Sequence, residues 1–365
     1  MRYHDLDVIN EIDWGITVDN ASSKQGGSRA RLRDIAAHAG VHISTASRVL
    51  NGDPRGEVSA DTTARVLAAA DTLQYKPNSA ARNLRLRRAG AFGLLIPDLT
   101  HPTYATLVRG ALQEAEGRGL AVLITEVPDG AAAIGLRRLV DDHRIDGLLI
   151  ATASDRSAQA DWFEGHGVPT VYVNRRAEGK PTVTVDDEAG AALALRTMYD
   201  YGHRRVGVIS GPHDVDTARR RLDGFISAAN TLGIPVPVES CGEYTANGGA
   251  SALTSLMSDP NPPTAIFASN LMSGIGALSR ASAHGIRIPD ELSLVVFDDA
   301  EIADFTVPAL TRIKMPFDEL GALAVRSLIE VLDGRQARDL RVETPPQLIG
   351  GASLGPNMNV GMARQ

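Results

Sequence analysis

The chain has 365 residues, of which 43% are hydrophobic and 22% charged, so it holds enough apolar side chains for one or two large cores. Its single cysteine, Cys241, excludes an intrachain disulfide, and no apolar run approaches the roughly 18 residues of a membrane span. The N-terminus is acidic and lacks the apolar stretch of a signal peptide, so we expect a cytoplasmic protein with no membrane partner.

The net charge of −7 is distributed unevenly along the chain. Residues 1–28 carry 2 basic and 5 acidic side chains, residues 29–90 carry 11 and 5, and residues 91–365 carry 24 and 34. A short basic segment on an acidic body is attracted to phosphate while the body is repelled. The charge pattern therefore favours nucleic-acid binding through the basic segment, although chance clustering also explains it.

Three segments precede the main body of the chain. Residues 1–28 are a flexible acidic extension, ending in the polar run Ala-Ser-Ser-Lys-Gln-Gly-Gly-Ser. Residues 29–75 form a helical head, because the apolar spacing from Arg31 to Leu50 predicts two short helices broken by a turn at Gly40. Ser59 can cap a third helix, Ala60 to Leu73. Residues 76–89, short and basic, are predicted to be a hinge helix.

The first two helices have the spacing of a helix-turn-helix, in which the second helix reads DNA. That helix exposes Ile43, Ser44, Ser47 and Arg48. An arginine at such a position can make a bidentate contact to guanine, and serine hydroxyls suit phosphates or base edges. Many helical pairs share this pattern, so the pattern alone leaves DNA binding open.

Residues 90–356 alternate apolar strands with amphipathic helices, and residues 357–365 form a tail. The expected strands are Phe92–Ile96, Leu120–Thr125, Gly147–Ile150, Thr170–Val173, Arg205–Ile209, Thr264–Ala268 and Leu294–Phe297, with a first helix at Tyr104–Arg118. Such alternation indicates parallel sheets with helices on both faces. About 260 residues and two successive sets of strands predict two similar α/β lobes.

From Leu32 to Pro356 the chain resembles the lactose-repressor (LacI/GalR) family of transcriptional regulators. The matching positions of the head are Asp34, Ile35, Ala36, Ala39, Gly40, Val41, Thr45, Ser47, Arg48, Val49, Leu50, Asn51 and Gly52. The matching positions of the hinge are Tyr75, Pro77, Asn78, Ala81, Arg82 and Leu84. The resemblance implies an all-α helix-turn-helix head with a hinge helix, followed by a two-lobed α/β core like that of periplasmic binding proteins.

The resemblance also implies the roles of the DNA-contacting residues. Ile43, Ser44 and Arg48 would read the major groove, while Thr45, Ser47, Asn51 and Asn78 would contact the backbone. In the hinge, Ala81 would join the DNA-binding surface and Leu84 would be a minor-groove wedge, unstacking one base step to bend the DNA. Two departures weaken helix capping: His42 replaces a serine and Arg31 a threonine, although His42 could still approach a phosphate.

In the core, the resemblance implies an effector cleft between the lobes. Its lining would comprise Asp98, Thr103, Tyr104, Asn174, Arg219, Asn270 and Asp298. Arg219 would suit an anionic or polyhydroxyl ligand through its fork of donors. Sugar-responsive members carry Asp after the asparagine, but this chain has Leu271, so the effector is left open among a modified sugar, a phosphorylated or carboxylated metabolite and a less polar compound.

The predicted function is that of a sequence-specific repressor of a catabolic or transport operon. Two heads of a homodimer would bind a pseudo-palindromic double-stranded operator, and a small effector between the lobes would release or engage them. The helices Tyr104–Arg118 and Phe317–Leu332 would form the dimer face. An activator or a ligand-independent regulator on the same fold remains an alternative, and each would be cytoplasmic and associated with the nucleoid.

Two other classes of protein fit less well. An enzyme on a doubly wound fold would need a phosphate loop or a catalytic cluster, and the turns after Ile96 and Ile209 match neither the dinucleotide nor the P-loop pattern. The nine histidines show no metal-ligand spacing, so no catalytic residue, metal or cofactor is predicted. A solute-capture protein would need an export signal and no DNA-binding head.

Overall fold

A computed structural model describes residues 30–51, 58–75, 88–127, 134–151, 162–163, 165–336 and 338–357, without the side chains of Asn51 and Ile134. The chain divides into two compact units, residues 1–79 and residues 80–365. The predicted hinge positions Asn78, Ala81 and Leu84 lie outside the described residues, as do residues 1–28.

The head consists of α1 (Leu32–Ala39), α2 (Ile43–Asn51) and α3 (Ala60–Thr72). Gly40 ends α1 at a φ of 64°, a left-handed conformation that a residue with a Cβ rarely adopts. The hydroxyl of Ser59 accepts a hydrogen bond from the backbone N–H of Thr62 and so caps α3, as expected from the sequence. The core contains Ile35, Ala36, Ala39, Ala46, Val66, Ala69 and Ala70. Five alanines in so small a core let the helices cross closely.

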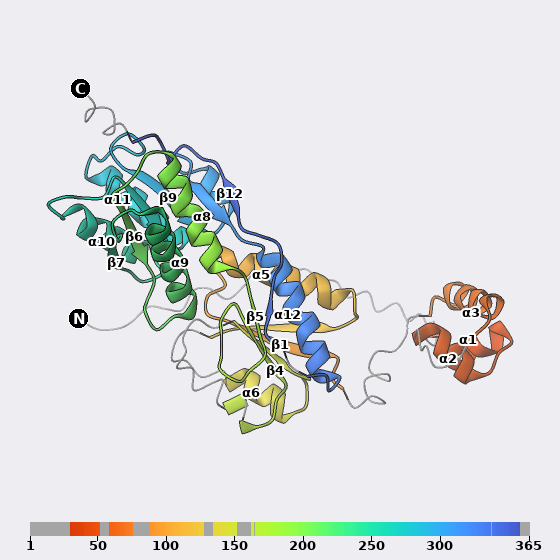
Figure 1. The fold of residues 1–365 in the computed structure, drawn as a ribbon. Coiled ribbons are helices and arrows are strands. Elements are labelled where there is room, and N and C mark those ends of the chain that lie inside the picture. The colour runs from red at the N-terminus through yellow and green to blue at the C-terminus, as the bar shows by residue number, and fades with distance from the viewer. Residues whose placement is uncertain are drawn as a thin grey trace, which may run out of the picture. The chain divides into compact units, whose positions relative to one another are not determined.

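The first lobe of the body is a six-stranded parallel sheet covered by helices (Figure 1). In sheet order its strands are β11 (Leu340–Arg341), β5 (Thr182–Thr184), β4 (Thr170–Val173), β3 (Leu148–Ile150), β1 (Ala91–Ile96) and β2 (Ala121–Glu126). Its helices are α5 (Pro102–Glu116), α6 (Ile134–Asp141) and α12 (Phe317–Leu332). Four of the predicted strands thus coincide with β1 to β4.

The second lobe repeats this plan with one antiparallel edge strand. Its sheet runs β12 (Gln347–Ile349), β10 (Thr311–Lys314), β9 (Ser293–Phe297), β8 (Ala265–Ala268), β6 (Val206–Ser210) and β7 (Val238–Cys241), with β12 antiparallel to β10. Its helices are α8 (Asp187–Asp200), α9 (Asp216–Leu232), α10 (Ala246–Met257), α11 (Leu271–Ala283) and the 3-10 helix η1 (Glu301–Asp304).

The sequence predicted two lobes that follow one another along the chain. In the structure the chain instead crosses between the lobes three times. The chain passes from the first lobe to the second after β5, returns after β10 to form α12 and β11, and crosses again to form β12. Helical and strand periodicity are local signals, so they identify the elements but not the sheet that each element joins.

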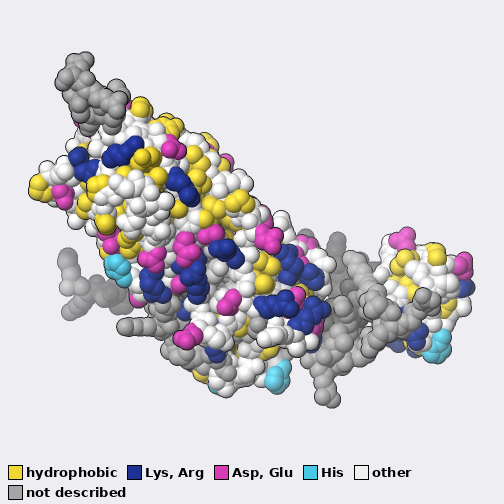
Figure 2. All heavy atoms as spheres, in the orientation of Figure 1, with side chains coloured by type: hydrophobic (Ala, Val, Ile, Leu, Met, Phe, Trp, Pro, Cys, Tyr) yellow, Lys and Arg dark blue, Asp and Glu magenta, His cyan; other side chains and the backbone are white. Residues whose placement is uncertain are grey.

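Helix α12 lies along α5 within the chain (Figure 1). A Cβ on Gly110 of α5 would lie 1.9 Å from the backbone oxygen of Asp318, so only glycine permits this approach. The apolar face of α12, which includes Phe317, Leu320 and Leu328, is therefore buried inside one chain. The dimer contact predicted for these two helices would have to use their other faces. On the face drawn in Figure 2, acidic and basic side chains gather around the lobe that contains α12.

Candidate functional site

Most of the residues predicted to contact DNA lie on α2, and they differ in their exposure to solvent. Ile43, Ser44 and Arg48 are exposed, and Thr45 and Ser47 are half-buried along the same helix. Ala46 is fully buried and anchors the helix to the head core. The core of the head therefore positions α2 with its polar and cationic face in solvent, which is the orientation that groove reading requires.

The His42 side chain takes over the cap that the sequence analysis expected to be weakened. Its Nδ1 accepts a hydrogen bond from the backbone N–H of Ser44 at 3.3 Å and lies 2.7 Å from the Ser44 hydroxyl. At α1, the Asp34 carboxylate accepts a hydrogen bond from the backbone N–H of Arg31 at 2.8 Å. Both helix starts are therefore stabilised without the usual Ser or Thr.

In the body, several predicted effector residues follow the carboxyl ends of parallel strands. Asp98 follows β1, Asn174 follows β4, Asn270 follows β8 and Asp298 follows β9. Parallel strand ends share one edge of a sheet, and this edge is where open α/β folds bind ligands. The fold therefore places polar side chains from both lobes at edges suited to a ligand.

One buried carboxylate links two arginines of α9. Asp187 is fully buried and accepts hydrogen bonds from Arg220 and, at 2.7 Å, from Nε of Arg221. Arg220 also donates to Asp216 at 2.9 Å and to the Asn174 carbonyl oxygen at 3.3 Å, the latter across the lobe boundary. These charge-assisted hydrogen bonds hold both guanidinium groups in one orientation.

Arg221 extends this network toward the other predicted residues. It donates to the Ser269 carbonyl oxygen at 2.6 Å and lies 3.8 Å from the Asp298 carboxylate, with its guanidinium over the ring of Phe297. Burial alone would lower the pKa of Arg221, but Asp187 and Asp298 raise it above the ordinary value. Arg221 is therefore a permanent cation whose charge is already compensated inside the protein.

A second set of contacts joins the lobes directly. Nδ2 of Asn270, in the second lobe, lies 3.1 Å from Nε2 of His101, in the first. The His101 ring also meets the Tyr104 ring edge-on at 5.7 Å between centroids. We call His101, Asp187, Arg220, Arg221, Asn270 and Asp298 the interlobe cluster.

Several buried polar atoms in and beside the interlobe cluster have no hydrogen-bond partner among the described residues. They are Nδ1 of His101, Oγ1 of Thr103, Oδ1 of Asn174 and Oδ1 of Asp298. Buried polar atoms are nearly always hydrogen-bonded in folded proteins. These four atoms, one nitrogen and three oxygens, lack hydrogen-bond partners in the described part of the chain and come from both lobes. They fit a ligand that carries both hydrogen-bond donors and acceptors.

Backbone strain coincides with two of these positions. Asn174 has a φ of 59° and Asp298 a φ of 78°, whereas the other described non-glycine residues with positive φ, Gln74 and His143, lie in turns. A left-handed backbone costs energy for a residue with a Cβ and is concentrated at functional sites. At both strand ends this conformation directs a polar residue out of the sheet.

The structure separates the predicted effector residues into two groups. Asn270 and Asp298 belong to the interlobe cluster, Thr103 and Tyr104 lie beside His101, and Asn174 contacts Arg220. Asp98 instead accepts hydrogen bonds from Thr100, which lower the pKa of its carboxyl.

Arg219 is not part of the interlobe cluster. Its side chain is 43% exposed and donates to the His213 carbonyl oxygen at 3.0 Å. The helical period explains the difference, because Gly224 packs against α8 and positions three and four residues earlier share its face. Arg220 and Arg221 therefore point inward while Arg219 points outward.

Leu271, the departure that made a sugar effector less secure, does not face the interlobe cluster. It is fully buried in the hydrophobic core of the second lobe. Among the described residues, the carboxylate that remains at the interlobe cluster without a hydrogen-bond partner on one of its oxygens is that of Asp298. His101, Asp187, Arg220 and Arg221 were not among the predicted effector residues. The two arginines were detectable from their helical spacing to Gly224.

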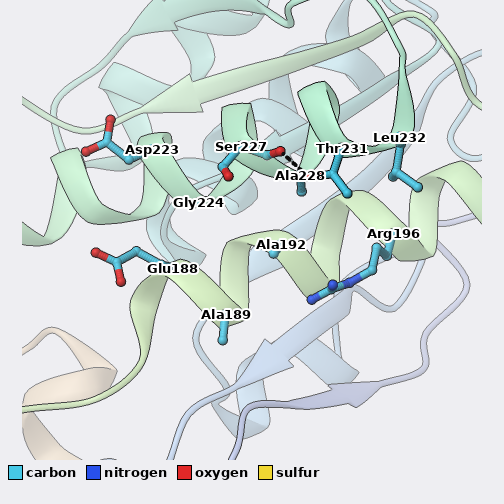
Figure 3. A pocket seen from close by; sticks show the side chains of 10 residues that line it. All are labelled: Glu188, Ala189, Ala192, Arg196, Asp223, Gly224, Ser227, Ala228, Thr231 and Leu232. Atoms are coloured by element: carbon cyan, nitrogen blue, oxygen red, sulfur yellow. Dashed lines mark hydrogen bonds between the residues drawn. The ribbon is translucent and has the colours of Figure 1, made fainter.

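A separate groove of about 480 Å³ lies between α8 and α9 (Figure 3). Its lining consists of Glu188, Ala189, Ala192, Arg196, Asp223, Gly224, Ser227, Ala228, Thr231 and Leu232. None of the predicted effector residues lines this groove. Within the described ranges, no three His, Cys, Asp or Glu residues are grouped as a metal site requires, and no helix combines the length and hydropathy of a membrane span.

A helical head with an exposed second helix and a two-lobed α/β body define the class of ligand-responsive transcription regulators. Residues 31–78 match the family model described as bacterial regulatory proteins, lacI family, and residues 195–354 match the periplasmic binding protein-like domain. The ribose operon repressor of Escherichia coli K12 is 33% identical over 327 residues, covering 88% of this chain and 98% of that protein. The chain belongs to the LacI family of bacterial regulatory proteins.

Solved structures show the same architecture. A complex of the transcriptional regulator CelR with cellobiose is 28% identical, with a TM-score of 0.67 over 89% of this chain and 100% of that one. The lac repressor dimer bound to operator and an anti-inducer is 26% identical, with a TM-score of 0.68 over 89% and 99%. These similarities confirm the predicted fold class and the prediction that the chain is a DNA-binding transcriptional regulator.

The Asp187 network generates a stability prediction. Asp187→Asn leaves Arg220 and Arg221 buried without their shared carboxylate, so we expect unfolding of the full chain in urea to show a loss of about 3–5 kcal/mol. The matched control is Glu188→Gln on the next residue, whose ion pair with Arg176 is exposed and should contribute less than about 1 kcal/mol. Equal, small losses in both variants would contradict the role assigned to Asp187.

Proposed function

We propose that the chain is a homodimeric repressor that binds a pseudo-palindromic operator through α2 and is controlled by a neutral, polyhydroxylated effector at the interlobe cluster. The single observation that carries the effector assignment is the compensated charge of Arg221, which donates to Asp187 and lies beside Asp298. The carboxylates of Asp187, Asp216 and Asp298 outnumber the guanidinium groups of Arg220 and Arg221, so an added phosphate or carboxylate is repelled, whereas neutral hydroxyl groups can both donate and accept there.

The comparisons support this chemistry, since one relative is named a ribose operon repressor and one similar structure contains cellobiose. Asp298 would accept from a ligand hydroxyl, and Thr103 and Asn174 would provide further polar contacts. In this proposal Arg221, rather than Arg219, is the arginine that faces the effector.

DNA binding rests on the exposed face of α2. Arg48 would read a base edge with Ile43 and Ser44 beside it, and Thr45, Ser47, Asn51 and His42 would contact the backbone. Residues 76–89 would act as the hinge helix, with Asn78, Ala81 and Leu84 on the DNA. The protein would act in the cytoplasm, on the nucleoid, and without enzymatic activity.

Dimer formation is supported by exposed apolar side chains on the body. Ile302, Phe305 and Val307, in and after η1, are 50%, 72% and 90% exposed. A contiguous stretch of such side chains is typical of a protein–protein contact. The lac repressor structure is described as a dimer on its operator, and two heads would contact the two halves of a pseudo-palindrome.

The DNA-binding proposal predicts the effect of Arg48→Ala. A DNA fragment selected from a random pool by the wild-type protein should lose roughly 1–3 kcal/mol of its preference over unselected DNA, because a base contact is removed. Fluorescence anisotropy at one fixed salt concentration measures this preference. Arg33→Ala, on the exposed part of α1, is the control and should leave the preference intact. An unchanged preference in Arg48→Ala would refute base reading by this residue.

The effector proposal predicts selective binding of neutral sugars. Ribose or cellobiose should raise the melting temperature of the full chain, and the corresponding sugar phosphates should not. Asp298→Asn should weaken the sugar by roughly 1.5–3 kcal/mol, the value of a hydrogen bond to a charged group. The control is Asp290→Asn, an exposed carboxylate in the same lobe. If the sugar phosphates bound more strongly than the neutral sugars, the proposal that the effector is neutral would be wrong.

The dimer proposal predicts that Phe305→Asp shifts the chain toward monomers, because a carboxylate would be buried without a partner at the contact. Sedimentation velocity measures the change. Val236→Asp is a matched control, since Val236 is 65% exposed in the same lobe but away from η1. A wild-type monomer, or equal effects of both variants, would count against this dimer face.

A further inference from the structure

His101 and Asn270 form a direct polar contact between the two lobes. His101 is the residue before α5 in the first lobe, and Asn270 is the residue before α11 in the second. The distance between Nε2 of His101 and Nδ2 of Asn270 is 3.1 Å. Any movement that separates the lobes at this point breaks the contact.

The orientation of the Asn270 amide is set by two backbone groups. Its Oδ1 accepts a hydrogen bond from the backbone N–H of Ser273 at 2.8 Å, and its Nδ2 donates to the Tyr244 carbonyl oxygen at 3.2 Å. A backbone N–H only donates and a carbonyl oxygen only accepts, so the amide cannot rotate without losing both bonds and the cap of α11. Asn270 therefore presents its second N–H to His101.

This geometry determines where the proton of His101 lies. Because Asn270 donates, Nε2 of His101 must carry a lone pair, and the ring proton of the neutral histidine must be on Nδ1. Nδ1 is buried and has no hydrogen-bond partner among the described residues. The contact thus leaves an N–H donor at the interlobe cluster.

We propose that His101 is a latch between the lobes, which holds them together through Asn270 only in its neutral, Nδ1-protonated form and offers Nδ1–H to an oxygen atom of the effector. The effector part of this inference rests on the proposed function, whereas the latch does not. A protonated ring would direct a second N–H at the amide of Asn270, and two donors cannot bond each other. Acid therefore opens the latch.

The surroundings of His101 act on its charge in opposite directions. The groups that contact it or act on its charge are Asp98 in its own loop, Tyr104 on α5, Arg221 on α9, Asn270 before α11 and Asp298 after β9. The N-termini of α5 and α11 both disfavour a cation between them. Burial has the largest effect and lowers the pKa of His101. The carboxylates of Asp298 and Asp98 raise this pKa, and the guanidinium of Arg221 lowers it.

The sign of the pH effect follows from this lowered pKa. With the lobes apart, His101 would titrate near the ordinary histidine value of about 6.5, and with the latch closed it titrates at lower pH. Above about pH 6.5 both states are neutral and closure carries no proton cost. As the pH falls below that value, His101 becomes protonated in the open state but stays neutral in the closed state. The equilibrium therefore shifts progressively toward the open state.

The direct test is the tautomer and titration of His101 in the full, ligand-free chain. With ¹⁵N-labelled histidine, long-range ¹⁵N–¹H correlation spectra distinguish Nδ1–H from Nε2–H, and the signal lost in His101→Gln assigns the residue. We expect the Nδ1–H tautomer near neutral pH and a midpoint below that of an exposed histidine. An Nε2–H tautomer or an ordinary midpoint would overturn the latch, whatever the effector proves to be.

The variant Asn270→Asp tests whether Asn270 sets the tautomer and titration of His101, or whether burial alone does so. A carboxylate oxygen can still accept from Ser273 and cap α11, but the other oxygen now accepts where Asn270 donated. We expect the proton to move to Nε2 and the midpoint of His101 to rise rather than fall. A tautomer and midpoint equal to those of the wild type would show that Asn270 does not control His101. This variant also decides the question if His101→Gln does not fold.

Effector binding supplies the functional readout. With ribose and cellobiose as probes, wild-type affinity should fall with pH by up to about tenfold per unit below the histidine midpoint. His101→Gln keeps an amide oxygen as acceptor for Asn270 but does not titrate, so its affinity should be nearly independent of pH in this range. Equal pH profiles of the two proteins would contradict the latch. Absence of sugar binding at every pH would contradict the proposed effector, and the tautomer would still decide the latch.

Discussion

The body of this protein is organised around one carboxylate, that of Asp187, which is fully buried between two guanidinium groups. Burying three charged groups is costly, and the cost is offset only when hydrogen bonds satisfy each of them. Here Arg220 and Arg221 donate to Asp187 and to backbone carbonyls on both sides of the lobe boundary. Asp187 is also the first residue of α8, where the chain enters the second lobe. The same interaction thus holds the crossover between the lobes and orients the arginine of the interlobe cluster.

The charge of the cluster follows from this arrangement. Because the carboxylates of Asp187, Asp216 and Asp298 outnumber the guanidinium groups of Arg220 and Arg221, these side chains have no net positive charge to offer an anion. What the cluster does offer is a set of hydrogen-bonding atoms from both lobes, including the Nδ1 donor of His101 and the Asp298 oxygen. A neutral ligand with several hydroxyl groups can satisfy atoms on both lobes at once, and in doing so it favours the closed arrangement by the difference in its affinity for the two states. Repression and ligand binding would be coupled through this difference.

Much of the fold could be predicted from the sequence because its signals are local. Continuous apolar runs identified β1, β3, β4 and β8, and the glycine turn with its flanking helices identified the head. The short strands β5 and β11 carried too few residues for a periodic signal, and β12 joins its sheet from the far end of the chain. The interleaving of the lobes is a property of long-range pairing, which no local pattern contains.

The site could be predicted only in part. Asn270 and Asp298 follow apolar strands, so their place at a sheet edge could be inferred from the pattern. The resemblance implied Arg219, which lies in a run of three arginines, and only the phase of α9 relative to Gly224 shows that Arg220 and Arg221 face inward instead. His101 could not be found in this way, because its role depends on an asparagine 169 residues away in the other lobe and on the backbone groups that orient that amide.

Amide hydrogen exchange of the full chain with and without saturating ribose or cellobiose shows where a neutral ligand acts, without assuming the role of any residue. If the interlobe cluster is the effector site, protection should rise together in residues 98–104 of the first lobe and residues 270–273 of the second. Protection confined to one lobe, or to the groove between α8 and α9, would show that the interlobe cluster is not the effector site.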